Sequence, residues 1–332
     1  MRRTVVPGVV LALAVLVAGH GDESLATPVP SPPVTAGPLD ISAGVFLLDL
    51  VRVDAADQSV EADFIVYISW HDPRLADNPA AAMDKDTIWR PQILPVQGRK
   101  SLSIEWQDMS VDADGTVHLR RRYVGAVSAP LDLTAFPFDQ HVIPLTFTIP
   151  SVKLSDFRFT VDEAHSGRSP SNTVADWSVV SSHVNAAPFR IPEVGVTLPA
   201  FGFEIGVKRH RGFYIWGVIL PLAMIIAMSG AVYWLHTSYV TQKISIAITS
   251  ILTLIAYRFA LGTQVPRLSY LTRMDYFTMG ATILVFLAFL KTVIEAGLVH
   301  SGRETRAISI DRACRWGFPA ALVVVLYFSF MS

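Results

Sequence analysis

The sequence has a single cysteine and few charged side chains, and both shortages narrow the kind of protein it encodes. Only 17% of its 332 residues are charged while 51% are hydrophobic, against roughly 25% charged residues in soluble domains. Because Cys314 is the one cysteine, no disulfide forms within the chain. The net charge of -1 offers no bulk attraction to nucleic acid. The histidines are scattered without metal-ligand spacing, so we expect no metal and no cofactor. A membrane protein is the first interpretation.

The chain begins like a secretory signal. Two arginines precede an uncharged run over residues 4–19, which is too short for a comfortable membrane span. We therefore predict a signal peptide over residues 1–26, cleaved after Ala18 or Ala26, with an uncleaved anchor as the alternative. Residues 27–38 are rich in proline, which is typical of an extended linker. Export would place the region that follows outside the cytoplasm.

Residues 39–210 have the pattern of short strands rather than helices. β-Branched and aromatic residues gather in short runs, and clusters of turn-forming residues separate these runs. The clearest runs lie at 64–70, 101–106, 116–124 and 141–149. This length and pattern predict one exported, immunoglobulin-like β-sandwich that binds a ligand. Without a disulfide, the hydrophobic core must hold it together.

Residues 211–332 contain four apolar runs, which predict a four-helix transmembrane domain. We expect spans at about 213–235, 243–265, 274–298 and 314–331. A proline at 221 in the first span is tolerable if neighbouring helices satisfy the carbonyl it frees.

The expected topology follows from counting the spans. If the β domain is exported, the connector over 300–315 lies in the cytoplasm, and its excess of arginine agrees with the positive-inside rule. The loop after the second span, which contains Arg267 and Arg273, then lies beside the exported domain. Ligand binding in one domain could thereby act on the helix ends of the other.

The second span carries one stripe of side chains along its length. At about 100° per residue its members fall within about 40° of one line; they are Ser245, Thr249, Leu252, Ala256, Phe259 and Thr263. In a ring of copies, the hydroxyls would replace part of an ion's hydration shell, and rings of Leu252 and Phe259 would close a pore by dewetting. The alternative is that Ser and Thr pack helices together. The stripe thus predicts a pore lining with two apolar gates.

Short motifs follow one another along the chain. They are Trp70-His71-Asp72, Trp89-Arg90-Pro91, Phe136-Pro137-Phe138-Asp139, Arg209 ahead of the first span, Ile219-Leu220-Pro221-Leu222 within it, and Pro266-Arg267-Leu268 after the second span. In this order they resemble the pentameric ligand-gated ion channels, in the prokaryotic branch that lacks the loop cysteines. The family's two cysteines fall on Ala129 and Ile143.

This resemblance implies a homopentamer, in which four identical subunits join each chain around one axial pore. It implies agonist sites between neighbouring exported domains, and a multi-pass protein of the bacterial inner membrane with these domains on the periplasmic side. The six stripe residues become stacked rings, with Leu252 at the central gate and Phe259 near the outer mouth. Arg258 points about 140° from the axis, so we expect it to face a neighbouring helix or the outer water layer.

The resemblance also implies a surface that couples the two domains. Its expected upper members are Trp70, Asp72, Phe136, Pro137, Phe138, Asp139 and Arg209, and its lower members are Pro266 and Arg267. Asp139 and Arg209 are expected to form a partly buried ion pair, because an unpaired charge there would be costly. For Trp70 and Asp72, core and turn roles within the sandwich are the alternative.

Two departures from the family pattern leave the ion and the agonist open. The pore helix begins Thr241-Gln242-Lys243, which matches neither the cation-selective nor the anion-selective entry, and cations are favoured only because they are commoner among bacterial members. Phe147 and Phe201 are candidate site aromatics on one side, and Tyr67 is a candidate on the complementary side, but an intact amine-binding aromatic box is doubtful.

The sequence also suggests a more specific hypothesis, that the agonist carries a carboxylate. Arg120 and Arg122 share a strand face, and arginine suits carboxylate recognition; the alternative is a solvated strand face. Protons are a further candidate agonist, through histidines that titrate near neutral pH: His118, His141, His165 and His183.

Two other classes of protein remain as alternatives. A membrane-anchored binding module would bind the ligand without conducting ions. A membrane enzyme would need a nucleophile–base pair, a metal cluster or a phosphate loop, and the sequence offers none of these.

Overall fold

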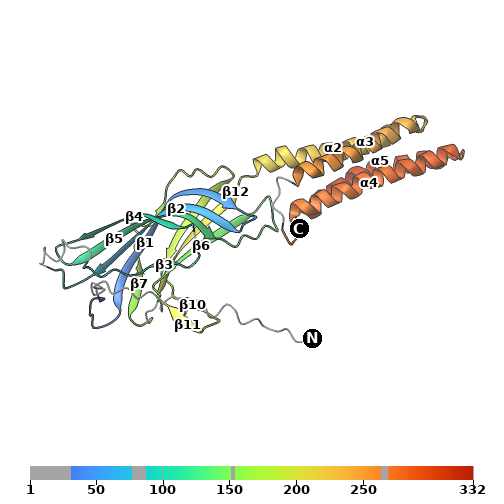
Figure 1. Cartoon of the computed structure of the whole chain (residues 1–332). Helices are drawn as coiled ribbons and strands as arrows, with labels where there is room; N and C mark the ends of the chain where they lie inside the picture. Colours follow the sequence, from blue (N-terminus) through green and yellow to red (C-terminus); the bar gives the residue numbers. More distant parts are fainter. Residues whose placement is uncertain (1–30, 77–86, 100, 151–153, 263–267, 332) are drawn as a thin grey trace, which may run out of the picture.

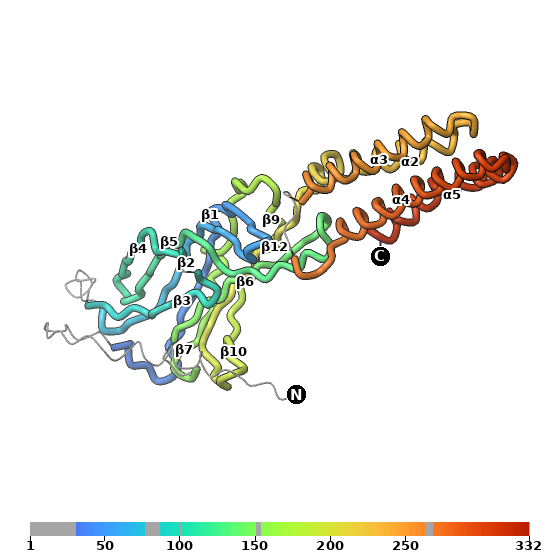
Figure 2. Tube along the Cα trace, turned by 45° about the vertical axis from the view of Figure 1, so that its right-hand side comes forward, coloured from blue at the N-terminus to red at the C-terminus, as the bar shows by residue number. Residues whose placement is uncertain are grey.

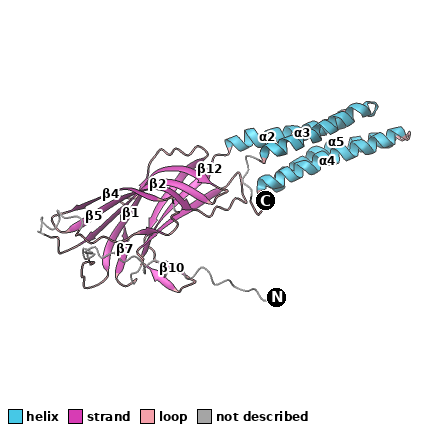
Figure 3. Ribbon diagram, viewed as in Figure 1, coloured by secondary structure: helices cyan, strands magenta, loops and turns pink. Residues whose placement is uncertain are grey.

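The computed structural model describes residues 31–76, 87–99, 101–150, 154–262 and 268–331. The predicted signal peptide lies outside these ranges, as do Thr263, Pro266 and Arg267. The described chain forms a β-sandwich followed by four long helices, which lie end to end with it (Figure 1). Strands and helices do not mix, as Figure 3 shows. The predicted fold class is confirmed.

The larger sheet of the sandwich has the strand order β4-β5-β2-β1-β7, with β8 paired to β1. Its strands are β1 (Leu39–Asp54), β2 (Ser59–His71), β4 (Ser103–Val111), β5 (Thr116–Ser128), β7 (Phe157–Val161) and β8 (Gly167–Arg168). All pairs are antiparallel except those of β1 with β7 and β8.

The second sheet has the order β3-β6-β12-β9, and a separate hairpin is formed by β10 and β11. Its strands are β3 (Leu94–Pro95), β6 (Gln140–Thr148), β9 (Trp177–Asn185) and β12 (Ala200–Arg209), and the hairpin is β10 (Phe189–Ile191) with β11 (Val196–Leu198). Figure 2 shows how the strands converge towards the helices at one end.

Alternating side chains build the core between the sheets. On β2, Phe64, Val66, Ile68 and Trp70 are buried while their neighbours face outwards, as the period of two requires. The ring of Phe64 meets that of Phe147 on the opposite sheet, with centroids 5.8 Å apart. Ala129 and Ile143, where the family has cysteines, are also buried apolar residues, so packing stabilises the sandwich where a disulfide would otherwise do so.

Four helical segments are long and apolar enough to cross a membrane: Tyr214–Trp234, Thr237–Leu261, Arg273–His300 and Glu304–Phe330. The first consists of a π-helical start (Tyr214–Ile219), α2 (Leu220–Gly230) and a 3-10 turn (Ala231–Trp234). The second is a 3-10 turn (Thr237–Tyr239) followed by α3 (Val240–Leu261). The last two are α4 (Arg273–His300) and α5 (Glu304–Phe330).

The fourth helix starts much earlier than the predicted span at 314. The expected connector over 300–315 shrinks to residues 301–303, because α5 begins at Glu304 and continues through Arg306 and Arg312. The apolar run used to predict the span begins only after these charged residues, but arginine is a good helix former, so the helix itself begins earlier. We call the end of the bundle formed by residues 235–239 and 301–303 the distal end; the other end contacts the sandwich (Figure 1).

Candidate pore and gating sites

Helix α3 has one covered face and one uncovered face within the subunit. Lys243, Ala247, Ser250, Leu254 and Leu261 are buried. The five described members of the predicted stripe are all exposed: Ser245, Thr249, Leu252, Ala256 and Phe259. Leu252 is 62% exposed and Phe259 is 77% exposed, although both are large and apolar. The subunit's other helices therefore leave the stripe bare.

Neither charge on α3 belongs to the stripe. Arg258 Nη1 lies 3.5 Å from the hydroxyl of Thr282 on α4, so this guanidinium faces a neighbouring helix as predicted. Lys243 is completely buried on the opposite side of α3. The described stripe therefore consists of uncharged side chains.

A hydroxyl from α3 satisfies the carbonyls near the proline of the first span. Pro221 has no N–H to donate to the carbonyl of Gly217, four residues earlier. The hydroxyl of Tyr257 donates to the carbonyl oxygen of Val218 at 2.8 Å and lies 3.4 Å from that of Gly217. A hydroxyl of a neighbouring helix thus reaches the freed carbonyl of Gly217 with a long contact and bonds more closely to the carbonyl of Val218 beside it. That neighbour is α3, the candidate pore helix.

The loop over residues 131–139 contacts three parts of the helical domain. The backbone N–H of Leu133 donates to the hydroxyl of Tyr270 at 2.9 Å, and Thr134 accepts a bond from the N–H of Arg273. The ring of Phe136 lies edge-on to Tyr214 at the start of the first span, and the ring of Phe138 meets Phe330 at the end of α5 (centroids 4.9 and 5.4 Å). Pro137, which lies between Phe136 and Phe138 in the sequence, is also buried. This loop therefore joins the sandwich to the helical domain through backbone hydrogen bonds and aromatic contacts.

Asp139 and Arg209 form the buried ion pair that the sequence predicted. The guanidinium donates two hydrogen bonds to the carboxylate, at 2.8 and 3.0 Å, and the Nε2 atom of His141 lies 2.8 Å from the same carboxylate. The rings of Trp177 and Phe136 pack against the guanidinium, at 4.1 and 5.0 Å from its central carbon. Such planar stacking favours arginine over lysine.

The pKa of Asp139 is lowered from its usual 3.8. Burial acts in the opposite direction, but the hydrogen bonds from His141 and Arg209, together with the charge of Arg209, outweigh it. These contacts therefore favour the ionised form of Asp139 in the folded protein.

Trp70 and Asp72 do not belong to this junction, and the prediction is wrong for these two residues. The side chain of Gln58, in the β1–β2 turn, bonds to the backbone of Leu131 at 2.6 and 3.3 Å, so the start of β2 faces the helices. At roughly 3.3 Å per residue, the length of β2 places Trp70 about 40 Å from that turn. Trp70 packs on Trp89, and Asp72 pairs with Arg74. Core and turn roles account for both residues.

Sequence reasoning missed several members of the junction. Tyr214 and Tyr270 flank the spans, and Trp177 begins β9. Aromatic residues beside a span are typical of a membrane interface, and this was the available signal for the two tyrosines. Gln58 gave none, because a turn residue does not reveal which end of a sandwich it occupies.

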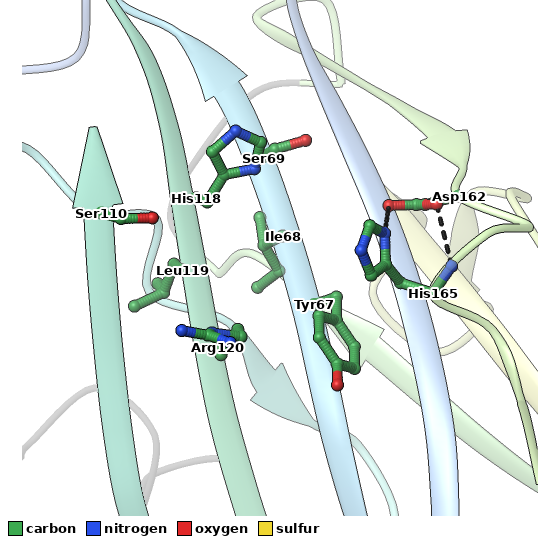
Figure 4. A pocket seen from close by; sticks show the side chains of 9 residues that line it. All are labelled: Tyr67, Ile68, Ser69, Ser110, His118, Leu119, Arg120, Asp162 and His165. Atoms are coloured by element: carbon green, nitrogen blue, oxygen red, sulfur yellow. Dashed lines mark hydrogen bonds and ion pairs between the residues drawn. The ribbon is translucent and has the colours of Figure 1, made fainter. Parts of the chain in front are cut away.

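A pocket of about 360 Å³ opens on the outer face of the larger sheet. Figure 4 shows its lining: Tyr67, Ile68, Ser69, Ser110, His118, Leu119, Arg120, Asp162 and His165. Tyr67 stacks on His165 with centroids 4.9 Å apart, and His165 Nδ1 lies 2.8 Å from Asp162. The structure thus brings the predicted residues Tyr67 and Arg120 together, since they also face one another in the strand register.

The two arginines proposed for a carboxylate agonist already have carboxylate partners. Arg120 bonds to Asp108, and Arg122 makes two bonds to Asp63, at 2.6 and 2.9 Å. Arg122 also lies outside the lining of the pocket. A carboxylate ligand would have to compete with these acids.

Phe147 and Phe201 are core residues, which corrects their assignment to an agonist site. Both are 0% exposed, and their rings stack on one another between the sheets with centroids 5.0 Å apart. The alternation of β6 and β12 turns these side chains inwards, so neither ring is accessible to a ligand in this conformation.

Comparison with known proteins agrees with this architecture. Residues 27–184 match the neurotransmitter-gated ion-channel ligand binding domain, and residues 218–309 match the neurotransmitter-gated ion-channel transmembrane region. The chain belongs to the neurotransmitter-gated ion-channel family, and it is a ligand-gated ion channel that crosses the membrane several times. It is 25% identical over 316 residues to a protein of Gloeobacter violaceus named "Proton-gated ion channel", in an alignment covering 91% of this chain and 86% of that one.

Proposed function

We propose that five copies of the chain surround one axial pore lined by α3, and that Leu252 and Phe259 are its gates. The observation that carries this proposal is the uncovered stripe on α3. Hydroxyls turned towards lipid would gain nothing from hydrocarbon, whereas around a shared axis they meet water and ions. The large exposed side chains of Leu252 and Phe259 would then form apolar rings beyond them.

The orientation of Thr249 supports conduction of cations. Its hydroxyl donates to the carbonyl oxygen of Ser245 at 2.8 Å. What the side chain offers outwards is therefore oxygen lone pairs, which coordinate cations and repel anions. No charge in the described stripe opposes this preference.

We infer that protons acting on the exported domain open the pore. The pocket on the larger sheet contains two histidines beside carboxylates: His165 with Asp162, and His118 with Asp112 at 3.1 Å. Histidine is the side chain most used as a sensor of mild acid, and a carboxylate lies beside each of these two rings. Arg120 and Arg122 are occupied by acids, which weakens the case for a carboxylate agonist. The name of the Gloeobacter relative points in the same direction.

We place the exported domain on the periplasmic side of a bacterial inner membrane. Arg303 lies at the distal end, and Arg306, Arg312 and Arg315 follow it in the first part of α5; such a bias marks the cytoplasmic side. The loop over 131–139 then transmits movement of the sandwich to the helix ends that it contacts.

Purified channel in planar bilayers tests this proposal directly. Stepping the pH from 7.5 to 5 on the sandwich side should evoke unitary currents, and His118→Gln and His165→Gln should shift activation to more acidic pH. His183→Gln on β9, outside the pocket, is the matched control. Absence of current at any pH, or particles without fivefold symmetry, would indicate a non-conducting binding module instead.

A further inference from the structure

Four charged side chains from three helices meet inside the helical bundle. Lys243 Nζ on α3 lies 2.5 Å from both Glu295 on α4 and Asp311 on α5. Lys291 Nζ on α4 lies 2.6 Å from Glu295 and also contacts Asp311. Each ammonium therefore touches both carboxylates, and the cluster has no net formal charge. We call Lys243, Lys291, Glu295 and Asp311 the charge quartet.

The quartet is buried within the distal half of the bundle. Lys243 is 0% exposed and Glu295 is 1% exposed, and the ring of Tyr233 lies 4.9 Å from Lys291 Nζ. Ionised groups in a membrane interior are costly and persist when they pair completely. Because all four groups share their partners, removal of one member leaves a net charge among the other three.

Lys243 is attached to the side of α3 directly opposite the stripe. At about 100° per residue, Ser245 lies about 200° from Lys243, Leu252 about 180° and Phe259 about 160°. A bond that draws Lys243 into the bundle therefore turns the stripe outwards. Arg258, the other charge on α3, lies 3.5 Å from the hydroxyl of Thr282, and within the described part of the chain it has no ion pair like those of Lys243.

We propose that the charge quartet is a rotational clamp on the pore helix, in which Lys243 is the positioning residue that keeps the stripe turned towards the pore. This rests on the proposed function, because the stripe must line a pore for its direction to matter. Lys243 lies in the distal part of α3 and forms two ion pairs, one with Glu295 on α4 and one with Asp311 on α5. The helix α3 therefore cannot rotate about its axis without breaking both ion pairs.

The test measures which face of α3 meets water. In a Cys314→Ser background, Ser245→Cys on the stripe and Ala247→Cys on the buried face are exposed to a water-borne thiol reagent while the channel is open. Ser245→Cys should react much faster than Ala247→Cys. Lys243→Met should reduce this ratio of rates by about tenfold or more, equivalent to about 1.4 kcal/mol. Arg258→Gln, which removes the other charge of α3, should leave the ratio unchanged.

A double variant separates rotation from stability. Lys243→Met with Asp311→Asn leaves Lys291 and Glu295 as a balanced pair, so thermal stability should recover relative to Lys243→Met alone. The clamp predicts that the ratio of labelling rates stays low in the double variant, because α3 is still detached. Recovery of both quantities would show a purely structural role and overturn the proposal.

The remaining outcomes are also decisive. If the double variant conducts and keeps the high ratio of labelling rates, the clamp is wrong while the proposed pore stands. If neither Ser245→Cys nor Thr249→Cys reacts in a channel whose quartet is intact, the proposed pore is wrong, whatever the quartet does. A double variant that fails to assemble also counts against the clamp, since its remaining charges are balanced.

Discussion

Buried charges lie at the junction between the domains and in the distal half of the helical bundle, and the two sites are built differently. At the junction, the single carboxylate of Asp139 serves Arg209 and His141, and aromatic rings surround the guanidinium. In the distal half, the charge quartet pairs two cations with two anions. The junction joins a loop and a strand of the sandwich next to the first span, whereas the quartet joins three helices of one domain. The difference suits the junction to transmit movement between the domains and the quartet to hold the helices together.

The largest effect should come from Asp139→Ala at the junction. Arg209 would be left buried without its carboxylate, at a cost of about 3–5 kcal/mol, and the contact between the domains would loosen. Acid-evoked currents should be lost while surface expression persists. Asp132→Ala, an exposed acid of the same loop, is the control. Normal currents in Asp139→Ala would show that the junction takes no part in gating, and the proposed difference between the junction and the quartet would be wrong.

Glu295→Gln should break the quartet with a somewhat smaller effect. It leaves an excess positive charge inside the bundle, and a loss of about 3 kcal/mol of stability is expected. Adding Lys291→Met should restore most of the thermal stability, because the remaining Lys243 and Asp311 balance each other. If the second substitution lowers the midpoint of unfolding further, neutrality is not what the quartet requires.

The pH dependence of stability should distinguish the junction from the proposed proton sensor at His118 and His165. The pKa of Asp139 is lowered from 3.8, so its contribution to stability is present above that value and is lost as the pH falls through the lower, folded-state pKa. The stability difference between the unaltered protein and Asp139→Asn should therefore be flat from pH 7 to 5 and decline only below pH 3.8. A decline already at pH 6 would mean that the junction itself senses protons.

Tyr257→Phe lies between the two charged sites and should cost about 1 kcal/mol, the net contribution of one hydrogen bond. It removes the donor to Val218 without changing the shape of the ring. Thermal unfolding and the pH of half-activation should both shift modestly. Tyr270→Phe is the matched control, because it removes a tyrosine hydroxyl at the junction instead of on α3. If both variants shift the pH of half-activation equally, the hydrogen bond from α3 has no special role in gating.

The smallest effect on stability should come from the arginines of the sheet face. The pair of Arg120 with Asp108 is exposed, and that of Arg122 with Asp63 is only partly buried; ion pairs near the surface contribute about 0–1 kcal/mol. Arg120→Ala and Arg122→Ala should therefore unfold close to the unaltered protein, in contrast to the buried sites. A panel of carboxylates applied to both variants checks the agonist as well: a carboxylate that activates the unaltered channel and fails on these variants would replace protons as the agonist.

Periodicity and hydropathy were sufficient to predict the parts of the fold with a repeating pattern. The stripe from Ser245 to Phe259 follows from the helical repeat alone, and the four spans follow from apolar runs. The pairing of Asp139 with Arg209 followed from the cost of burying either charge alone. Each of these predictions depends on the pattern within one helix or strand, or on the cost of burying an unpaired charge.

The misplaced residues have physical reasons. A strand pattern identifies β2 but not which of its ends faces the membrane, so Trp70 and Asp72 were assigned to the wrong end. Aromatic residues suit both a core and an agonist site, which is how Phe147 and Phe201 were misassigned. The quartet depends on three helices that meet only in the folded bundle. Its signal was present in the sequence, because Lys291 and Glu295 interrupt an apolar span at a spacing that places them on one helical face.

Pro221 and Tyr257 are complementary parts of a single hydrogen-bonding arrangement. The ring of the proline leaves a gap in the backbone of the first span, and the phenol from the second span fills it. A chain with Pro221→Ala would supply its own amide there and make the phenol dispensable. The proline thus leaves part of the hydrogen bonding of the first span to a side chain of the second, which ties the two spans together at this level of the bundle.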